Sequence, residues 1–208
     1  MTRLVTRIVV VRHGHVDGID PPRFRGCAEF PLSELGRRQA EALGRRVARG
    51  WQPDAIYTSN LSRCIDTGTA IERATGAPAS VLGELANIDY GQWQGLTHDR
   101  VESLWPGPAR MWFSKPDMAL IPGGETLAQV LVRVMSVLHF VLLKHAGQTV
   151  VLVGHDSVNR VLLLHCLGLS LSHYWQLRQT PCCVNECTFE DDSFVIQRIN
   201  ETGHLIGV

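Results

Sequence analysis

The stretch IVVVRHGHVDG, residues 8–18, governs the interpretation of the whole chain. Its first four residues are all β-branched, which is typical of a strand covered on both faces. The run ends abruptly in Arg12 and His13, with a second histidine and two glycines close behind. Cations and imidazoles are costly to bury unless something pairs with them. We therefore expect a polar site at the carboxyl end of this strand.

Composition limits the kind of protein that this is. The chain has 208 residues, 45% hydrophobic and 19% charged, which suits a single domain over residues 1–208. Lys+Arg and Asp+Glu number 20 each, so a formal net charge of zero argues against nucleic-acid or membrane-surface binding. The longest uncharged apolar stretch, between Arg133 and Lys144, is too short to cross a bilayer, and the N-terminus has no secretory pattern. We expect a cytoplasmic protein with reduced cysteines, because C-x-x-C spacing is missing.

Strand and helix patterns alternate along the chain. Further strands are expected at residues 54–59 and 149–154, followed by a hairpin within 183–200 that turns at Asp191-Asp192. Helices are expected from a cap at Ser33 to about residue 49, over 60–76 and 125–145, and from a cap at Ser157 to residue 167. This order predicts a three-layer α/β/α sandwich with a mainly parallel central sheet and an antiparallel edge strand.

Residues 83–124 show little periodicity and are broken by several prolines and glycines. A structureless segment of this length in a compact domain is usually functional. We expect it to form a long loop or lid region on the substrate side.

Two of the predicted strands end in histidine, at His13 and at His155. The carboxyl ends of neighbouring parallel strands meet at one edge of a sheet, where ligands bind. Arg12 joins them there, and Arg63 and Glu84 follow elements that end on the same rim. Arginine forks bind phosphate oxygens, a neutral histidine can be a covalent nucleophile, and a carboxyl group can give a proton to a leaving alcohol. The set favours phosphoryl transfer.

Six blocks of sequence occur in an order that resembles the histidine phosphatase superfamily, the phosphoglycerate mutase-like proteins. They are VVVRHG, FRGCAEFPLSELGRRQA, AIYTSNLSRCIDTGTAI, LGELANIDYGQWQGLT, IPGGET and VVLVGHDSVNRVLLLHCLGL. The similarity runs from Val9 to about Leu169, and it is closest to the shorter phosphatase branch.

The resemblance implies a role for each candidate residue. His13 would be the nucleophile and pass through a phosphohistidine, while Glu84 would be the proton donor. Arg12, Arg63 and His155 would hold the phosphate. Arg25 would be a further substrate-binding cation. The resemblance implies no metal and no cofactor, and a small phosphorylated metabolite as partner. A homodimer is left open.

The chain departs from the family pattern at two places. His15 and Val16 stand where R-H-G-E-T is common, and Ile19 stands where an asparagine often contacts the phosphate. Asp156-Ser157 replaces the frequent Gly-Gly after the second histidine. These departures suggest a distinct subgroup, and they leave the role of His15 open.

Three alternatives remain beside a phosphomonoester hydrolase. The first is phosphoglycerate mutase activity within the same family. The second is a metal-dependent hydrolase that uses His13, His15 and Asp17 as ligands in an H-x-H-x-D pattern. The third is a phosphate-binding or protein-interaction module without catalysis, which the presence of all four of His13, Arg63, Glu84 and His155 disfavours.

Overall fold

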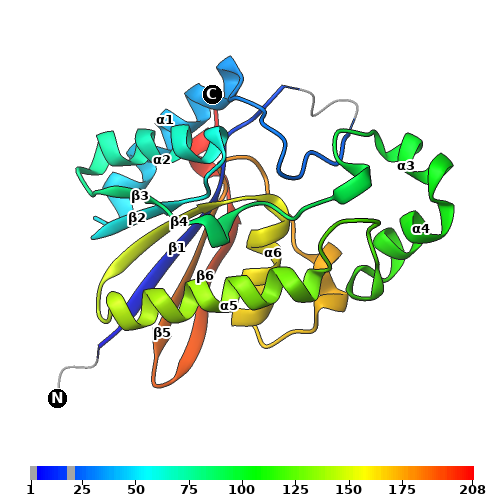
Figure 1. Ribbon diagram of the computed structural model, residues 1–208. Helices are drawn as coiled ribbons and strands as arrows, with labels where there is room; N and C mark the ends of the chain where they lie inside the picture. Colours follow the sequence, from blue (N-terminus) through cyan, green and yellow to red (C-terminus); the bar gives the residue numbers. More distant parts are fainter. Residues whose placement is uncertain (1–3, 18–21) are drawn as a thin grey trace.

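The computed structural model describes residues 4–17 and 22–208, and its central sheet has the strand order β3-β2-β4-β1-β5-β6 (Figure 1). The strands are β1 Thr6–Arg12, β2 Ala55–Thr58, β3 Ala79–Val81, β4 Thr149–Gly154, β5 Val184–Glu190 and β6 Ser193–Glu201. The first four in the sheet order are parallel, β5 is antiparallel to β1, and β6 is antiparallel to β5. The predicted α/β sandwich with a mainly parallel sheet and an antiparallel edge is confirmed.

Helices cover both faces of this sheet (Figure 1). They are α1 Glu34–Gly50, α2 Ser62–Thr75, α3 His98–Leu104, α4 Pro106–Ser114, α5 Leu127–Lys144 and α6 Asp156–Cys166. Short 3-10 turns lie at η1 Gly83–Leu85, η2 Gly91–Trp93, η3 Pro116–Met118, η4 Leu171–Gln176 and η5 Gly203–Leu205. Helices α1 and α2 pack together on one face, and α5 and α6 pack together on the other.

The alternation of side chains in β1 divides the core between the two faces. Val9 and Val11 pack with the apolar residues of α1 and α2. Ile8 and Val10 pack with those of α5 and α6. All four are at most 1% exposed, as expected for a central strand of a doubly covered sheet.

The tail forms the expected hairpin at the sheet edge. Asp191 and Asp192 both have positive φ, 48° and 57°, and Glu190 pairs with Ser193 across the turn. Positive φ at both central residues matches the twist of the strands that a two-residue turn connects.

Residues 83–124 differ from the predicted loop, because they contain the short helices α3 and α4 and three 3-10 turns. The side chain of Thr97 caps α3 and Pro106 opens α4, so each helix is too short to show a periodic pattern. The buried side chains of Trp93 and Trp112 anchor the segment to the core.

Two helix starts also differ from expectation. Helix α5 begins at Leu127 behind a capping box formed by Thr126 and Gln129. Helix α6 begins at Asp156, and the Ser157 hydroxyl contacts two tyrosines instead of capping the helix. By length and composition alone, α5 is the one described helix that could span a membrane, with a mean hydropathy of 1.7 over 18 residues.

Candidate active site

One cavity of about 310 Å³ opens at the carboxyl ends of the parallel strands. Arg12, His13, Arg25, Arg63 and His155 all line it. Five of the six residues predicted for the site are therefore brought together from distant parts of the chain.

The pairing of β1 with β4 explains how the two histidines meet. The strands are parallel, and Arg12 stands opposite Gly154 in their register. Each strand ends one residue before its histidine, and the His13 amide donates to the Gly154 carbonyl at 3.1 Å. The imidazole rings then lie with centroids 5.1 Å apart and planes at 62°.

The ring of His13 is held in one tautomer. Its Nδ1 lies 2.7 Å from the carbonyl oxygen of Gly14, and because a carbonyl can only accept, Nδ1 carries the proton. The other nitrogen, Nε2, then holds the lone pair. Burial lowers the pKa of His13 well below its usual range, and the nearby charges of His155, Arg12 and Arg63 lower it further. The neutral, nucleophilic form of the ring is therefore favoured.

Gly14 is required where this loop meets the start of α1. A Cβ atom there would lie 2.5 Å from the carbonyl oxygen of Gly36. The glycine thus allows the close backbone approach that fixes the loop carrying His13.

His155 is 1% exposed and lies beside two polar side chains. Its Nε2 is 2.9 Å from Ser59 Oγ and 3.4 Å from Cys64 Sγ. Burial, followed by the charges of nearby arginines, lowers the pKa of His155 well below its usual range. Burial also raises the pKa of Cys64 to about 12, so this thiol stays protonated and is a poor rival nucleophile.

Arg12 and Arg63 are anchored by backbone carbonyls. Arg63 donates to the carbonyl oxygens of Ala28 and Gly26, both at 2.9 Å, and Arg12 donates to that of Gln179. Within the described part of the chain, the buried Nε atoms of both arginines have no hydrogen-bond partner. Both arginines line the cavity, and guanidinium groups suit the oxygens of an anion.

Arg25 lies on the same wall. Burial lowers its pKa to about 10, and the charges of Arg12 and Arg63 contribute. This is a third guanidinium close to the other two, where like charges repel unless an anion binds between them.

Glu84 is the one predicted residue that does not join this cavity. Its side chain is exposed and borders a separate depression with Leu82, Ser136, Val137 and Phe140, against α5. The expected convergence of Glu84 with the histidines is therefore wrong. The position of Glu84 in the sequence, after the second strand and its helix, does not determine which side chains at and after η1 face the cavity. Asn87, three residues later, lines the cavity instead.

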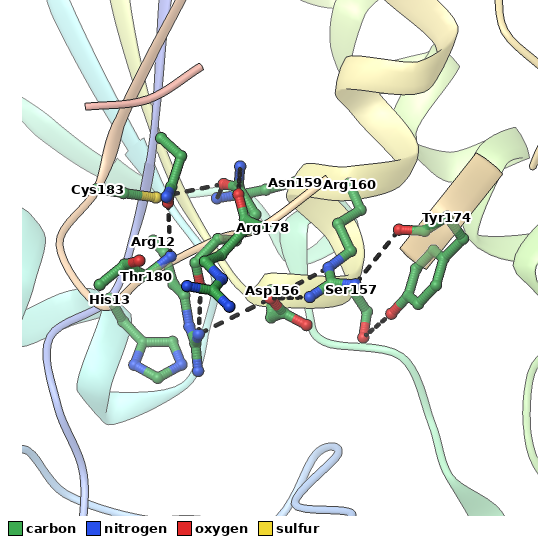
Figure 2. A network of polar contacts seen from close by, with 12 residues as sticks. Arg12, His13, Asp156, Ser157, Asn159, Arg160, Tyr174, Arg178, Thr180 and Cys183 are labelled. Atoms are coloured by element: carbon green, nitrogen blue, oxygen red, sulfur yellow. Dashed lines mark hydrogen bonds and ion pairs between the residues drawn. The ribbon is translucent and has the colours of Figure 1, made fainter. Parts of the chain in front are cut away.

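The cavity also contains residues that the sequence analysis did not assign to a site. They include Asn87, Tyr90, Asp156, Ser157, Arg160 and Trp175. From the sequence, Asp156 and Ser157 stand out only as a departure from the family pattern after His155. In Figure 2 the guanidinium of Arg12 lies between the His13 ring and the Asp156 carboxylate. The replacement of the frequent Gly-Gly by Asp156-Ser157 was the feature of the sequence that could have indicated their place in the cavity.

The residues of the metal-ligand alternative are separated. The ring of His15 bonds through Nδ1 to Ser33 Oγ at 2.8 Å, at the cap of α1, and His15 does not line the cavity. Residues 4–17 and 22–208 contain no group of three or more His, Cys, Asp or Glu side chains placed to share a metal ion. Ile19 lies outside the described residues.

The arrangement can therefore bind an anion at its floor and present a neutral imidazole nitrogen to it. The helix α6 starts at the same floor, and amides at a helix start also favour anions. Such a set of groups suits transfer of a phosphoryl group to nitrogen.

Comparison with known proteins agrees with this chemistry. Residues 8–202 match the family described as the histidine phosphatase superfamily (branch 1). Phosphoserine phosphatase 1 of Hydrogenobacter thermophilus is 31% identical over 201 residues, covering 97% of this chain and 95% of its own. The metal-independent phosphoserine phosphatase of Arabidopsis thaliana is 30% identical over 206 residues, which cover 98% of this chain and 85% of its own. Among solved structures, mycobacterial glucosyl-3-phosphoglycerate phosphatase superposes with a TM-score of 0.87 at 27% identity, covering 95% of this chain and 100% of its own.

Proposed function

This chain belongs to the histidine phosphatase superfamily, branch 1, and from that premise we propose that it hydrolyses a phosphomonoester of a small metabolite through a phosphohistidine on His13. The observation that carries the proposal is the pair of imidazoles 5.1 Å apart, His13 and His155, in a cavity that Arg12 and Arg63 also line.

The first step transfers the phosphoryl group to the protein. The lone pair of His13 Nε2 forms the N–P bond while the bond from phosphorus to the ester oxygen breaks. The guanidinium groups of Arg12 and Arg63, which line the cavity, bind the equatorial oxygens and balance their charge. The imidazole of His155, whose Nε2 lies 2.9 Å from Ser59 Oγ, completes the set of groups around these oxygens.

The second step returns the protein to its starting state. A water oxygen attacks phosphorus from the side that the alcohol has left, and the N–P bond breaks. Inorganic phosphate forms, and His13 Nε2 regains its lone pair. The Nδ1–H bond to Gly14 holds the ring in place through both steps.

Hydrolysis, rather than isomerisation, is supported by the activities for which the relatives are named. Two relatives at or above 30% identity over most of this chain are phosphoserine phosphatases. A third, the glucosyl-3-phosphoglycerate phosphatase of Mycolicibacterium vanbaalenii, is 32% identical over 178 residues. Our proposal extends to residues 83–124 as the substrate-side wall, since Asn87, Tyr90, His98 and Trp112 of this segment line the cavity.

Catalysis without a metal is also part of the proposal. It is supported by the guanidinium groups that crowd the anion site, because fixed cations oppose the binding of a dication. It is supported further by the name of the Arabidopsis relative.

The test is an assay with p-nitrophenyl phosphate followed by a screen of phosphorylated metabolites. We expect turnover that EDTA leaves unchanged and vanadate inhibits; a mycobacterial relative has been solved in complex with VO3. Loss of activity in EDTA with recovery on adding zinc would favour the metal-dependent alternative. The screen should release inorganic phosphate, whereas conversion of 3-phosphoglycerate to its isomer without phosphate release would favour a mutase.

A further inference from the structure

The proposed reaction needs a proton for the departing alcohol, and an alkoxide is a very poor leaving group without one. The cavity offers few groups that can supply it. Among the described residues that line it, Asp156 is the one carboxyl group. Asn87 lies where the long segment enters the cavity, but its amide cannot exchange a proton, and Glu84 is exposed elsewhere.

Asp156 lines the same cavity as the buried phosphate-binding candidates and is more exposed than they are. It directly follows His155 and opens α6. The side chain of Asp156 is 29% exposed, whereas Arg63 and His155 at the floor are 1% exposed. A phosphate held at the floor directs its ester oxygen outward, toward the level at which Asp156 lies.

The two oxygens of this carboxylate have different surroundings. Oδ1 accepts from Arg160 Nε and Nη2 at 3.2 and 3.1 Å, and Arg12 Nη1 lies 3.8 Å from it. No described residue makes a hydrogen bond or ion pair to Oδ2. One oxygen is therefore fixed, and the other is available to substrate.

Arg160 is itself firmly placed, so it can orient the carboxylate. Its Nη1 donates to the Tyr174 carbonyl at 3.3 Å. Its guanidinium also lies 5.0 Å from the ring centroids of both Tyr174 and Trp175. A carboxyl group held this way keeps one defined orientation in the cavity.

We propose that Asp156, and not Glu84, is the general acid and base of the reaction. The proposal rests on the proposed function. The substrate enters as a phosphate monoanion and passes its proton to Oδ2, which leaves a dianion between the arginines and a neutral carboxyl group. As His13 Nε2 forms the bond to phosphorus, the P–O ester bond breaks and the leaving oxygen takes that proton. In the second step the Asp156 carboxylate takes a proton from the attacking water.

The experiment compares Asp156→Asn with Glu84→Gln, which is the same change of carboxylate to amide outside the cavity. Single-turnover rates of phosphoryl transfer are measured with p-nitrophenyl, p-chlorophenyl and phenyl phosphate. These probes are similar in size, but their leaving groups need a proton to increasing degrees.

We expect Asp156→Asn to slow transfer from phenyl phosphate by about 100-fold or more and from p-nitrophenyl phosphate by about tenfold or less. Turnover of p-nitrophenyl phosphate should then show a burst of one equivalent of nitrophenolate, because water is no longer activated in the second step. Glu84→Gln should match the unmodified protein with every probe. The burst amplitude counts folded sites, so poor folding lowers the amplitude and not the rate constant. Asp156→Ser is measured in the same way if the asparagine variant does not fold.

Equal slowing with all three probes would overturn the proposal, because it would show that Asp156 acts only by holding Arg12. A leaving-group dependence in Glu84→Gln would overturn it as well. Failure of the proposed function has a different signature, since the unmodified protein would then neither hydrolyse any of the probes nor form a phosphoenzyme.

Discussion

The rings of His13 and His155 lie edge to face, 5.1 Å between centroids, at the ends of two adjacent parallel strands. The two histidines are far apart in the sequence, and the pairing of β1 with β4 brings them into contact. Burial, together with the charges of nearby arginines, lowers the pKa of both rings and favours their neutral forms. An anion bound beside the rings would pair with the positive charge of the arginines.

Arg63→Lys should weaken the binding of phosphate. Lysine cannot reproduce the two bonds of the guanidinium to Ala28 and Gly26 while also donating to an anion in the cavity. A charge-assisted hydrogen bond contributes about 1.5–3 kcal/mol, so the inhibition constant of vanadate should rise about 10- to 100-fold. Inhibition assays with p-nitrophenyl phosphate measure this change. An unchanged constant would remove Arg63 from the anion site.

The pH dependence of kcat/KM should reflect the lowered pKa of His13. A lower pKa means that the ring loses its proton at a lower pH, so the nucleophilic form is still abundant below pH 6.5, the ordinary value. The acid limb of the profile assigned to His13 should therefore lie below pH 6.5. Arg12→Gln removes a cation that lowers this pKa, and the limb should shift to higher pH. A limb at or above pH 6.5 in the unmodified protein would contradict this assignment.

His15→Ala should affect stability and spare activity. The ring of His15 bonds to Ser33 Oγ, which also accepts from the Gly36 amide at the start of α1. Loss of one such bond costs about 1 kcal/mol of unfolding free energy, which urea denaturation can measure. Turnover of p-nitrophenyl phosphate should stay within about threefold, given the small local change. A variant that folds normally but loses all turnover would revive the metal-ligand alternative.

Much of the site could be predicted from sequence because strand ends are well defined. A β-branched run that stops at a polar residue identifies both the strand and its carboxyl end, so Arg12, His13 and His155 were correctly expected at one edge. The strand and helix order likewise predicted the layers of the sandwich.

Side chains on irregular segments were harder to place. Within residues 83–124 the inward direction depends on how η1 and the buried tryptophans pack, and no periodicity records that. Glu84 was therefore expected in the cavity that Asn87 lines. Asp156 was noticed as an unusual residue, but its orientation depends on Arg160, one helical turn later, and on the tyrosine and tryptophan beside it.

The most direct test of the account is to trap the phosphoenzyme. The protein is mixed with a ³²P-labelled phosphomonoester that it hydrolyses, quenched in alkali, and digested to locate the label. We predict an acid-labile, alkali-stable phosphohistidine on the peptide that contains His13, and none in His13→Ala, which should also lose turnover. Normal labelling of His13→Ala, or label on any other residue, would contradict the account.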